Sequence, residues 1–298
     1  MPFVVTLVSG ATTLDEDILR RAAGALPGAQ KTIWLDEGTA ADIFFDGQMT
    51  PTAGGSVRAA LGDAPVDVFV QPGAGRRKRL LAADMDSTII GQECIDELAD
   101  FVGLRKHVTA ITERAMRGEI AFEPALRERV ALLENLPVDA VGRIIAERIT
   151  LVPGARTLVQ TMRAHGAHTI LLSGGFTLFT QEVAAMAGFD AHIGNRLAIA
   201  GGKLTGRVEE PVLGQTAKRE ALLGLCERHG IPVSDTLAVG DGANDLEMLA
   251  QAGLGVAFRA KPAVAAAAHA RVDHSDLTAL LYAQGYSRDE LRDSQPDG

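Results

Sequence analysis

Apolar and polar positions in the first 70 residues predict a compact α+β unit. Residues 15–26 carry apolar side chains at helical spacing, and residues 56–61 predict a second, shorter helix. Apolar runs of strand type flank these helices, and the turn at 36–38 joins two of them. The expected strands are residues 3–8, 32–35, 41–45 and 66–70. The order βαββαβ predicts a small ferredoxin-like unit.

From residue 80 onward, short apolar strands alternate with helical segments, which predicts a parallel, doubly wound α/β sheet. Residues 93–148 have helical spacing throughout and predict a helical subdomain inserted after the first strand. Residues 196–208 predict a hairpin about two glycines. The expected strands are 80–84, 168–173, 236–240, 255–258 and 270–272, and the expected helices are 154–166, 176–187, 215–229, 245–252, 263–268 and 276–284.

Two polar segments mark the limits of these units. Residues 72–75 are rich in Gly and Pro, and the basic run at 76–79 follows them, so we expect a linker with solvated charges. Residues 286–298 are polar and predict a frayed tail. The expected organisation is an α+β domain at 1–75, an α/β domain at 76–290 with its helical cap at about 93–148, and a polar tail at 291–298.

Composition narrows the class of protein. The chain has 298 residues, 47% of them hydrophobic and 22% charged, which fits a globular protein of two domains. Its net charge of -9 argues against a nucleic-acid partner. Cys94 and Cys226 imply neither a disulfide framework nor a cysteine metal site. The apolar run at 3–8 is too short for a signal peptide, and no segment approaches the ~20 apolar residues of a membrane span, so we expect a cytoplasmic protein.

The first candidate for chemistry is the pair Asp84 and Asp86, which follows the first strand of the α/β unit. The carboxyl ends of parallel strands are where open α/β sheets bind their ligands. One carboxylate of such a pair can attack an electrophile while the other moves protons. Because an isolated Asp-x-Asp is more often a solvated turn, the interpretation depends on the rest of the chain.

Three further motifs lie downstream: Ser173-Gly174-Gly175, Lys218 near the start of a helix, and the run from Gly240 to Asp245. Taken singly, each fits a turn or a solvated side chain. In this order and context, they resemble the haloacid-dehalogenase-type phosphatase superfamily. The resemblance covers about residues 80–290 and leaves the first 75 residues outside.

The resemblance implies roles for the acidic residues. Asp84 would be the nucleophile that forms an aspartyl phosphate, and Asp86 would be the general acid and base. It also implies Mg²⁺, held by the Asp84 carboxylate, the Asp86 backbone carbonyl and the Asp241 carboxylate, with Asp245 supporting through a hydrogen bond. Magnesium suits the site because phosphoryl transfer needs positive charge beside these anions.

The same resemblance places four residues around the phosphate. The Ser173 hydroxyl and the Gly174 amide would donate hydrogen bonds to phosphate oxygens. Lys218 would bring a compact positive charge to the phosphate and to the nucleophile. Asn244 would hydrogen-bond the substrate or the phosphate.

Within the superfamily, the helical insert resembles that of the phosphoserine phosphatases. Glu93 would take the substrate ammonium, Arg129 its carboxylate, Phe122 would help to close the lid, and Met116 would line the pocket. Arg127 also offers a guanidinium, and Arg129 is chosen by resemblance. The implied activity is hydrolysis of O-phospho-L-serine, the last step of serine biosynthesis.

Two other functions stay open. The same fold could act on another small phosphomonoester, since the substrate is set by few residues. A receiver-like phosphoacceptor module also uses an Asp, a metal and a Lys, but it lacks a helical insert. The N-terminal unit resembles ACT-type domains in element order only, and residues 9–14 lack the Asp-x-x-Gly turn of ligand-binding members. We therefore favour packing or a homodimer contact over serine sensing.

Overall fold

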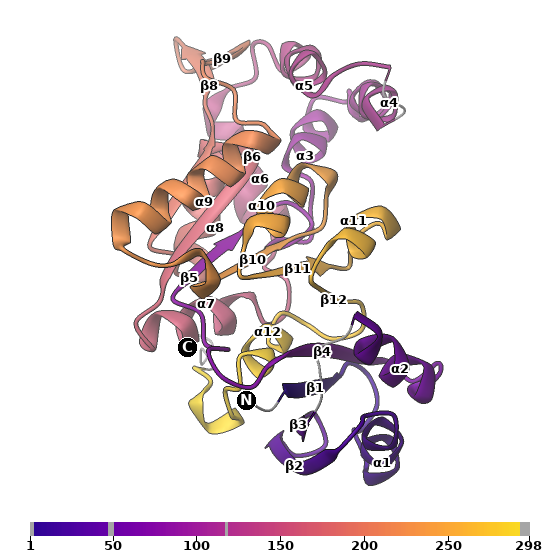
Figure 1. The fold of residues 1–298 in the computed structure, drawn as a ribbon. Helices are drawn as coiled ribbons and strands as arrows, with labels where there is room; N and C mark the ends of the chain where they lie inside the picture. The colour runs from indigo at the N-terminus through magenta and orange to yellow at the C-terminus, as the bar shows by residue number, and fades with distance from the viewer. Residues whose placement is uncertain (1–2, 47–50, 117–118, 293–298) are drawn as a thin grey trace.

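The N-terminal unit forms the four-stranded sheet that the element order predicts. The computed structural model describes residues 3–46, 51–116 and 119–292, without the side chains of residues 51, 52 and 116 (Figure 1). The antiparallel sheet has the order β2-β3-β1-β4. Its elements are β1 (Phe3–Ser9), α1 (Glu16–Gly24), β2 (Ala29–Asp36), β3 (Ala40–Phe45), α2 (Pro51–Leu61) and β4 (Val66–Pro72). The Asp15 side chain begins α1 by accepting the Ile18 N–H at 2.8 Å.

The second unit is a six-stranded parallel sheet of order β12-β11-β10-β5-β6-β7, which confirms the predicted doubly wound α/β fold. The strands are β5 (Leu80–Ala83), β6 (His168–Phe176), β7 (Ala191–Asn195), β10 (Thr236–Gly240), β11 (Leu254–Phe258) and β12 (Ala270–Val272). The helices are α7 (Ala155–Ala164), α8 (Thr177–Ala187), α9 (Gln215–His229), α10 (Leu246–Gln251), α11 (Pro262–Ala267) and α12 (Ala279–Ala283). Helices cover both faces of the sheet, so β5 is buried throughout.

The helical insert forms a cap at one end of this sheet (Figure 1). It consists of α3 (Cys94–Phe101), α4 (Arg105–Met116), α5 (Phe122–Ala131) and α6 (Val138–Arg148), as the helical spacing predicts. The two segments that connect it to the sheet pair with each other through a bridge between Ile90 and Leu151. The Gln92 carboxamide strengthens this pairing by bonding the backbone and the side chain of Thr150.

The predicted hairpin is formed by β8 (Leu197–Ala200) and β9 (Lys203–Val208). It leaves the parallel sheet after β7 and lies beside α5 of the cap (Figure 1). Its backbone is hydrogen-bonded to the cap, because Leu204 exchanges bonds of 2.9 Å with Asn135 and Leu136 and the Gly202 carbonyl accepts the Val138 N–H at 3.0 Å. The hairpin therefore ties the cap to the sheet in addition to the two covalent connections.

The face of the N-terminal sheet opposite its helices packs on the C-terminal part of the chain. Val8, Ala40 and Phe69 share one apolar core with Leu277 and Leu281, and α12 packs against β1. Polar contacts cross the same boundary. The Tyr282 hydroxyl donates to Asp36 at 2.6 Å, and the Gln71 carboxamide donates to the Ala283 carbonyl.

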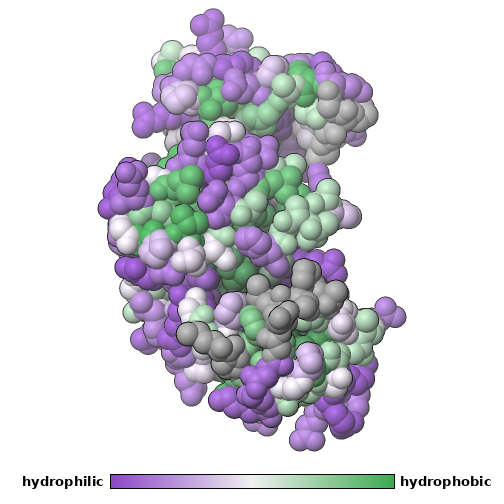
Figure 2. Space-filling view, viewed as in Figure 1, coloured by the Kyte–Doolittle hydropathy of each residue, from purple (hydrophilic) through white to green (hydrophobic). Residues whose placement is uncertain are grey.

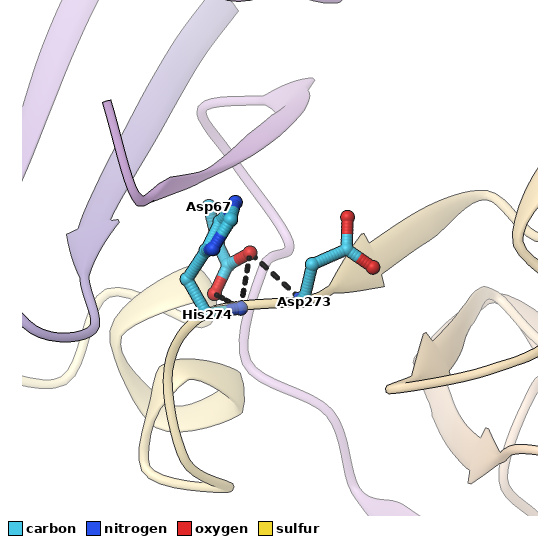
Figure 3. A group of neighbouring side chains, drawn as sticks. All are labelled: Asp67, Asp273 and His274. Carbon is cyan, nitrogen blue, oxygen red and sulfur yellow. Dashed lines mark hydrogen bonds between the residues drawn. The ribbon is translucent and has the colours of Figure 1, made fainter. Parts of the chain in front are cut away.

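Asp67 on β4 makes several of these polar contacts, and Figure 3 shows those with Asp273 and His274. Its carboxylate accepts the N–H groups of Asp273 and Ser275 at 2.8 Å and that of His274 at 3.3 Å. Asp67, Asp273 and His274 are close enough to surround a cation. Because both oxygens of Asp67 already accept backbone N–H groups, we interpret this group as a contact that holds the two units together.

The basic run at 76–79 is only partly the solvated linker that its composition predicts: Arg77 and Arg79 are exposed, but Arg76 and Lys78 are bonded to other parts of the chain. The Arg76 guanidinium bonds both oxygens of Asp42 in the N-terminal sheet, at 2.7 and 3.0 Å, and the two side chains are only 12% and 2% exposed. The Lys78 ammonium donates to the Ser234 carbonyl at 2.8 Å. For Arg76 the prediction was wrong because its partner, the Asp42 carboxylate, lies on a strand 34 residues earlier in the chain.

Two other expectations need correction. The edge strand β7 was not predicted, because its residues, Ala-His-Ile-Gly-Asn, show neither alternation nor a continuous apolar run. The predicted frayed tail is ordered over residues 286–292: Tyr286 and Leu291 are buried, and Glu290 pairs with Arg77 at 2.7 Å. Residues 293–298 lie outside the described residues.

The surface is largely polar on the face shown in Figure 2, where apolar residues form small groups between hydrophilic ones. Within the described part of the chain, every helix is too short or too polar to cross a membrane. Both cysteines are free and buried.

Candidate active site

Three neighbouring strands bring the predicted site residues together. β5 lies between β10 and β6, and all three run parallel, so their carboxyl ends meet at one edge of the sheet. Asp84 and Asp86 follow β5, Ser173 lies in the last part of β6, and Asp241 follows β10. The cap stands over this edge (Figure 1).

Lys218 on α9 forms the buried centre of the site. Its Nζ lies 2.6 Å from Asp84 Oδ1 and 2.7 Å from Asp245 Oδ1, and its side chain is 4% exposed. Burial alone would lower the pKa of Lys218, but the carboxylates of Asp84 and Asp245 raise it above its usual value, so the lysine stays charged. Gly240 allows Asp245 to approach, because a Cβ there would lie 2.4 Å from Asp245 Cγ.

Asp84, Asp241 and Asp245 offer carboxylate oxygens that lie within 4.8 Å of one another. Burial, the charge of Asp84 and that of Glu93 raise the pKa of Asp241 to about 6, against a 3.2 Å hydrogen bond from the Thr88 hydroxyl. The single positive charge of Lys218 cannot neutralise the negative charges of three carboxylates. A cluster of hard oxygen ligands with surplus negative charge fits a hard divalent cation.

Asp86 lies beside this cluster in a different setting. Its Oδ1 accepts the Cys94 N–H at the start of α3 at 2.9 Å, and the Ser173 hydroxyl is 3.4 Å from its Oδ2. Burial raises the pKa of Asp86 to about 6; the Cys94 contact opposes the shift and the charge of Asp84 adds to it. A carboxyl with this pKa can donate or accept a proton near neutral pH.

The Ser173-Gly174-Gly175 segment passes close to Asp86. The Gly175 N–H donates to Ser173 Oγ at 2.8 Å. A Cβ on Gly175 would lie 2.8 Å from Asp86 Oδ2, so a larger residue would displace the carboxylate. Glycine is therefore required here by the close approach of the backbone to the site.

The cap brings Glu93 and Arg129 toward the same edge. The Ser87 hydroxyl donates to the Glu93 carboxylate at 2.7 Å, and burial together with the charge of Asp86 raises the pKa of Glu93 to about 7. Burial lowers the pKa of Arg129, although Asp96 and Glu93 oppose this shift with their negative charges. Arg127, the alternative guanidinium, pairs with Glu210 at 2.5 Å and lies near Glu123 on the outside.

Phe122, at the start of α5, lies over the Ser173-Gly174-Gly175 segment. Its ring is 3.6 Å from the position a Cβ on Gly174 would take and 3.7 Å from that of Gly214. Asn244 is half-buried in the turn that leads to Asp245. The side chain of Met116 lies outside the described residues.

Sequence reasoning missed the buried Asn195, which lies beside the site. The Asn195 carboxamide donates to the Gly174 carbonyl at 2.8 Å and accepts the Leu213 N–H at 2.7 Å. An asparagine before a predicted hairpin looks like an ordinary turn residue, and its partners are backbone groups 21 and 18 residues away. The sequence therefore carries no signal for this contact.

The comparisons with known proteins agree with this geometry. A family model described as haloacid dehalogenase-like hydrolase matches residues 81–250, which is more than half of the chain. The chain belongs to the haloacid dehalogenase-like hydrolases, and the resemblance drawn from its motifs is confirmed.

Among individual relatives, phosphoserine phosphatase SerB2 of Mycobacterium tuberculosis is 42% identical over 228 residues, which are 76% of this chain and 56% of that protein. The chain thus spans little more than half the length of that curated relative. A hydrolase structure from Salmonella enterica covers 97% of this chain and 99% of its own, with a TM-score of 0.86 and 29% identity. A structure of a phospho-aspartyl intermediate analogue of phosphoserine phosphatase covers 69% of this chain and 98% of its own, with a TM-score of 0.64 and 40% identity.

Proposed function

We propose that this protein hydrolyses O-phospho-L-serine to L-serine and phosphate through an aspartyl-phosphate intermediate, as the last step of serine biosynthesis. The observation that carries the proposal is the meeting of Asp84 with Lys218 at 2.6 Å, at the same sheet edge as Asp86 and Ser173. Its relatives named phosphoserine phosphatase support this substrate.

The first step transfers the phosphoryl group to Asp84. One Asp84 carboxylate oxygen attacks phosphorus, and the bond from phosphorus to the serine oxygen breaks. Asp86 donates its proton to the departing serine oxygen. The Lys218 ammonium, the Ser173 hydroxyl and the Gly174 amide offset the charge on the phosphoryl oxygens.

The second step releases phosphate. Asp86, now ionised, takes a proton from a water molecule that attacks the phosphorus of the aspartyl phosphate. The bond from phosphorus to the Asp84 oxygen then breaks, which restores the carboxylate. The pKa of Asp86, about 6, supports its use in both directions.

Magnesium is the cation we propose for the acidic cluster. Asp84 and Asp241 would hold it with their carboxylates and Asp86 with its backbone carbonyl, while Asp245 would orient Lys218 beside it. When bound, it would supply positive charge against the phosphate. The cluster of carboxylate oxygens within 4.8 Å of one another supports this assignment. The pKa of Asp241 is raised chiefly by burial, and the negative charges of Asp84 and Glu93 add to the shift.

The cap supports an amino-acid phosphate as the substrate. We propose that Glu93 binds the ammonium and Arg129 the carboxylate, with Met116 and Phe122 enclosing the substrate and Asn244 bonding it from the sheet edge. Arg129 is favoured over Arg127 because its charge interacts with Glu93 and Asp96, whereas Arg127 pairs with Glu210 outside. A receiver-like module would need no such cap.

Further proposals concern the whole chain. We propose a division into an ACT-like domain at 1–75, a catalytic domain at 76–290 with its cap at 93–148, and a tail at 291–298. Two free, buried cysteines support a reducing, cytoplasmic setting. The edge strand β2, with Ile33 and Trp34 exposed, supports a homodimer contact through the N-terminal unit.

The test is magnesium-dependent phosphate release from a panel of small phosphomonoesters, ranked by kcat/KM. We expect O-phospho-L-serine to lead by orders of magnitude over sugar phosphates and aryl phosphates. If a substrate without ammonium and carboxylate groups leads, the assignment to phosphoserine is wrong and the alternative phosphomonoesterase function takes its place.

A further inference from the structure

The buried side-chain amide of Asn195 connects the Ser173-Gly174-Gly175 segment to the residues that precede α9, the helix that carries Lys218. It ends the edge strand β7, opposite Phe176 of β6. Its Nδ2 donates to the Gly174 carbonyl at 2.8 Å and to the Leu213 carbonyl at 3.4 Å, and its Oδ1 accepts the Leu213 N–H at 2.7 Å. Leu213 stands directly before Gly214, the N-cap residue of α9.

The bond to Gly174 reaches the proposed catalytic groups through one peptide plane. The Gly174 carbonyl and the Gly175 N–H belong to the same rigid peptide unit. Asn195 holds the carbonyl, and the N–H donates to Ser173 Oγ at 2.8 Å. Ser173 Oγ in turn lies 3.4 Å from Asp86 Oδ2. Rotation of this peptide would therefore move both the Ser173 hydroxyl and its contact with Asp86.

The bonds between Asn195 and Leu213 join the two ends of the segment that contains the hairpin. Residues 196–212 leave the parallel sheet after Asn195 and return at Leu213, and the hairpin they contain is hydrogen-bonded to the cap. The backbone is also closely packed at the preceding residue, Gly194, where a Cβ would lie 3.2 Å from the Gly175 carbonyl oxygen. Phe122 of the cap lies over both loops that Asn195 connects, at Gly174 and at Gly214.

We propose that Asn195 is a positioning residue for phosphoryl transfer: it fixes the Gly174–Gly175 peptide, and through it the Ser173 hydroxyl, relative to Lys218. This inference rests on the proposed phosphatase function and adds a residue that contacts neither substrate nor metal. Because the phosphate group is common to all substrates, loss of Asn195 should slow every phosphomonoester alike.

The test compares Asn195→Ala and Asn195→Asp with the control Gln284→Ala. Aspartate keeps the size of the side chain and can accept the Leu213 N–H, but it cannot donate to the Gly174 carbonyl. Gln284 is also a buried carboxamide between backbone groups, since it accepts the Lys78 N–H and donates to the Leu280 carbonyl, both at 2.9 Å, far from the site. Thermal melts establish that each variant is folded.

The assays give kcat and KM for O-phospho-L-serine and for 4-nitrophenyl phosphate in magnesium buffer. For both Asn195 variants we expect kcat to fall by about 10- to 100-fold on both substrates, with KM changed by less than about 3-fold, because misplaced groups act mainly on the transition state. Gln284→Ala should lose thermal stability but keep its kcat.

Wild-type kcat in folded Asn195→Asp would overturn the inference, and so would a loss confined to phosphoserine, which would assign Asn195 to the cap pocket. A wrong substrate assignment would give a different result, because the wild-type protein itself would then prefer a substrate without ammonium and carboxylate groups. The Asn195 variants would in that case be compared on that substrate and on 4-nitrophenyl phosphate.

Discussion

The Nζ of Lys218 lies 2.6 Å from Asp84 Oδ1, and the two side chains are 4% and 6% exposed. This contact places a fixed positive charge beside the proposed nucleophile, where an anionic substrate must approach. Asp245 holds the same ammonium from the other side at 2.7 Å, so the lysine has little freedom to turn away. The geometry favours attack by a carboxylate on a phosphate.

Substituting Asp84→Asn should abolish formation of the phosphoenzyme, because an amide cannot form the acyl phosphate. We expect kcat to fall on the order of 10⁴-fold or more, as for loss of other enzyme nucleophiles. The measurement is acid-quench trapping of labelled phosphate on the protein, with Asp100→Asn on the cap surface as a control that keeps both label and activity. Label that persists in the Asp84→Asn variant would exclude Asp84 as the nucleophile.

Substituting Arg129→Ala should lower kcat/KM for phosphoserine by an amount equal to about 2–5 kcal/mol, the usual cost of leaving one charge of a desolvated pair without its partner. Hydrolysis of 4-nitrophenyl phosphate, which has no carboxylate, should hardly change. Arg127→Ala is the matched control on the same helix, because its guanidinium pairs with Glu210. Equal losses on both substrates would reject a carboxylate-binding role for Arg129.

Without divalent metal, the free energy of unfolding should decrease as pH rises. Burial raises the pKa of Asp86 and Asp241 to about 6 and that of Glu93 to about 7. Between about pH 4 and 7 these groups bind more protons in the folded chain than in the unfolded one, so the free energy of unfolding decreases as pH rises through this window.

Thermal melts in EDTA should therefore give a higher Tm at pH 5.5 than at pH 7.5, by about 2 °C or more. Saturating Mg²⁺ should raise Tm chiefly at pH 7.5, where the carboxylates are ionised and can bind it. A magnesium shift of the same size at both pH values would contradict the proposed cation site.

Substituting Arg76→Ala should lower the free energy of unfolding by about 3–5 kcal/mol, because it leaves the buried carboxylate of Asp42 without its positively charged partner. Arg77→Ala is the control: that guanidinium is 46% exposed, and its pair with Glu290 should contribute at most about 1 kcal/mol. Urea unfolding of both variants makes the comparison. Similar small losses would show that Arg76 does not hold the two units together.

The sequence predicts those parts of the fold whose patterns are local. The strand before Asp84 is a continuous apolar run, and α1 has apolar residues at helical spacing, so both were identified. β7 escaped prediction because an edge strand of five residues with Gly194 and two polar residues has no periodicity to detect.

Contacts between distant segments could not be predicted in the same way. The motif residues Asp84, Ser173 and Asp241 could be placed together because parallel strands end at one edge. Arg76 and Asn195 could not, since each is defined by a partner that only the folded chain brings near: a carboxylate on β3 and two backbone loops. A basic run and a single asparagine look the same in the sequence whether they are buried or solvated.

The docking of the N-terminal sheet on the C-terminal segment sets an order for events during synthesis. Gln71 and its partner Ala283 are 212 residues apart, so β4 leaves the ribosome long before the surface that covers it exists. At about 5–20 residues per second, this delay is roughly 10–40 s. For that interval the apolar face formed by Val8, Ala40 and Phe69 is open to water and to other nascent chains, until α12 has been made and covers it.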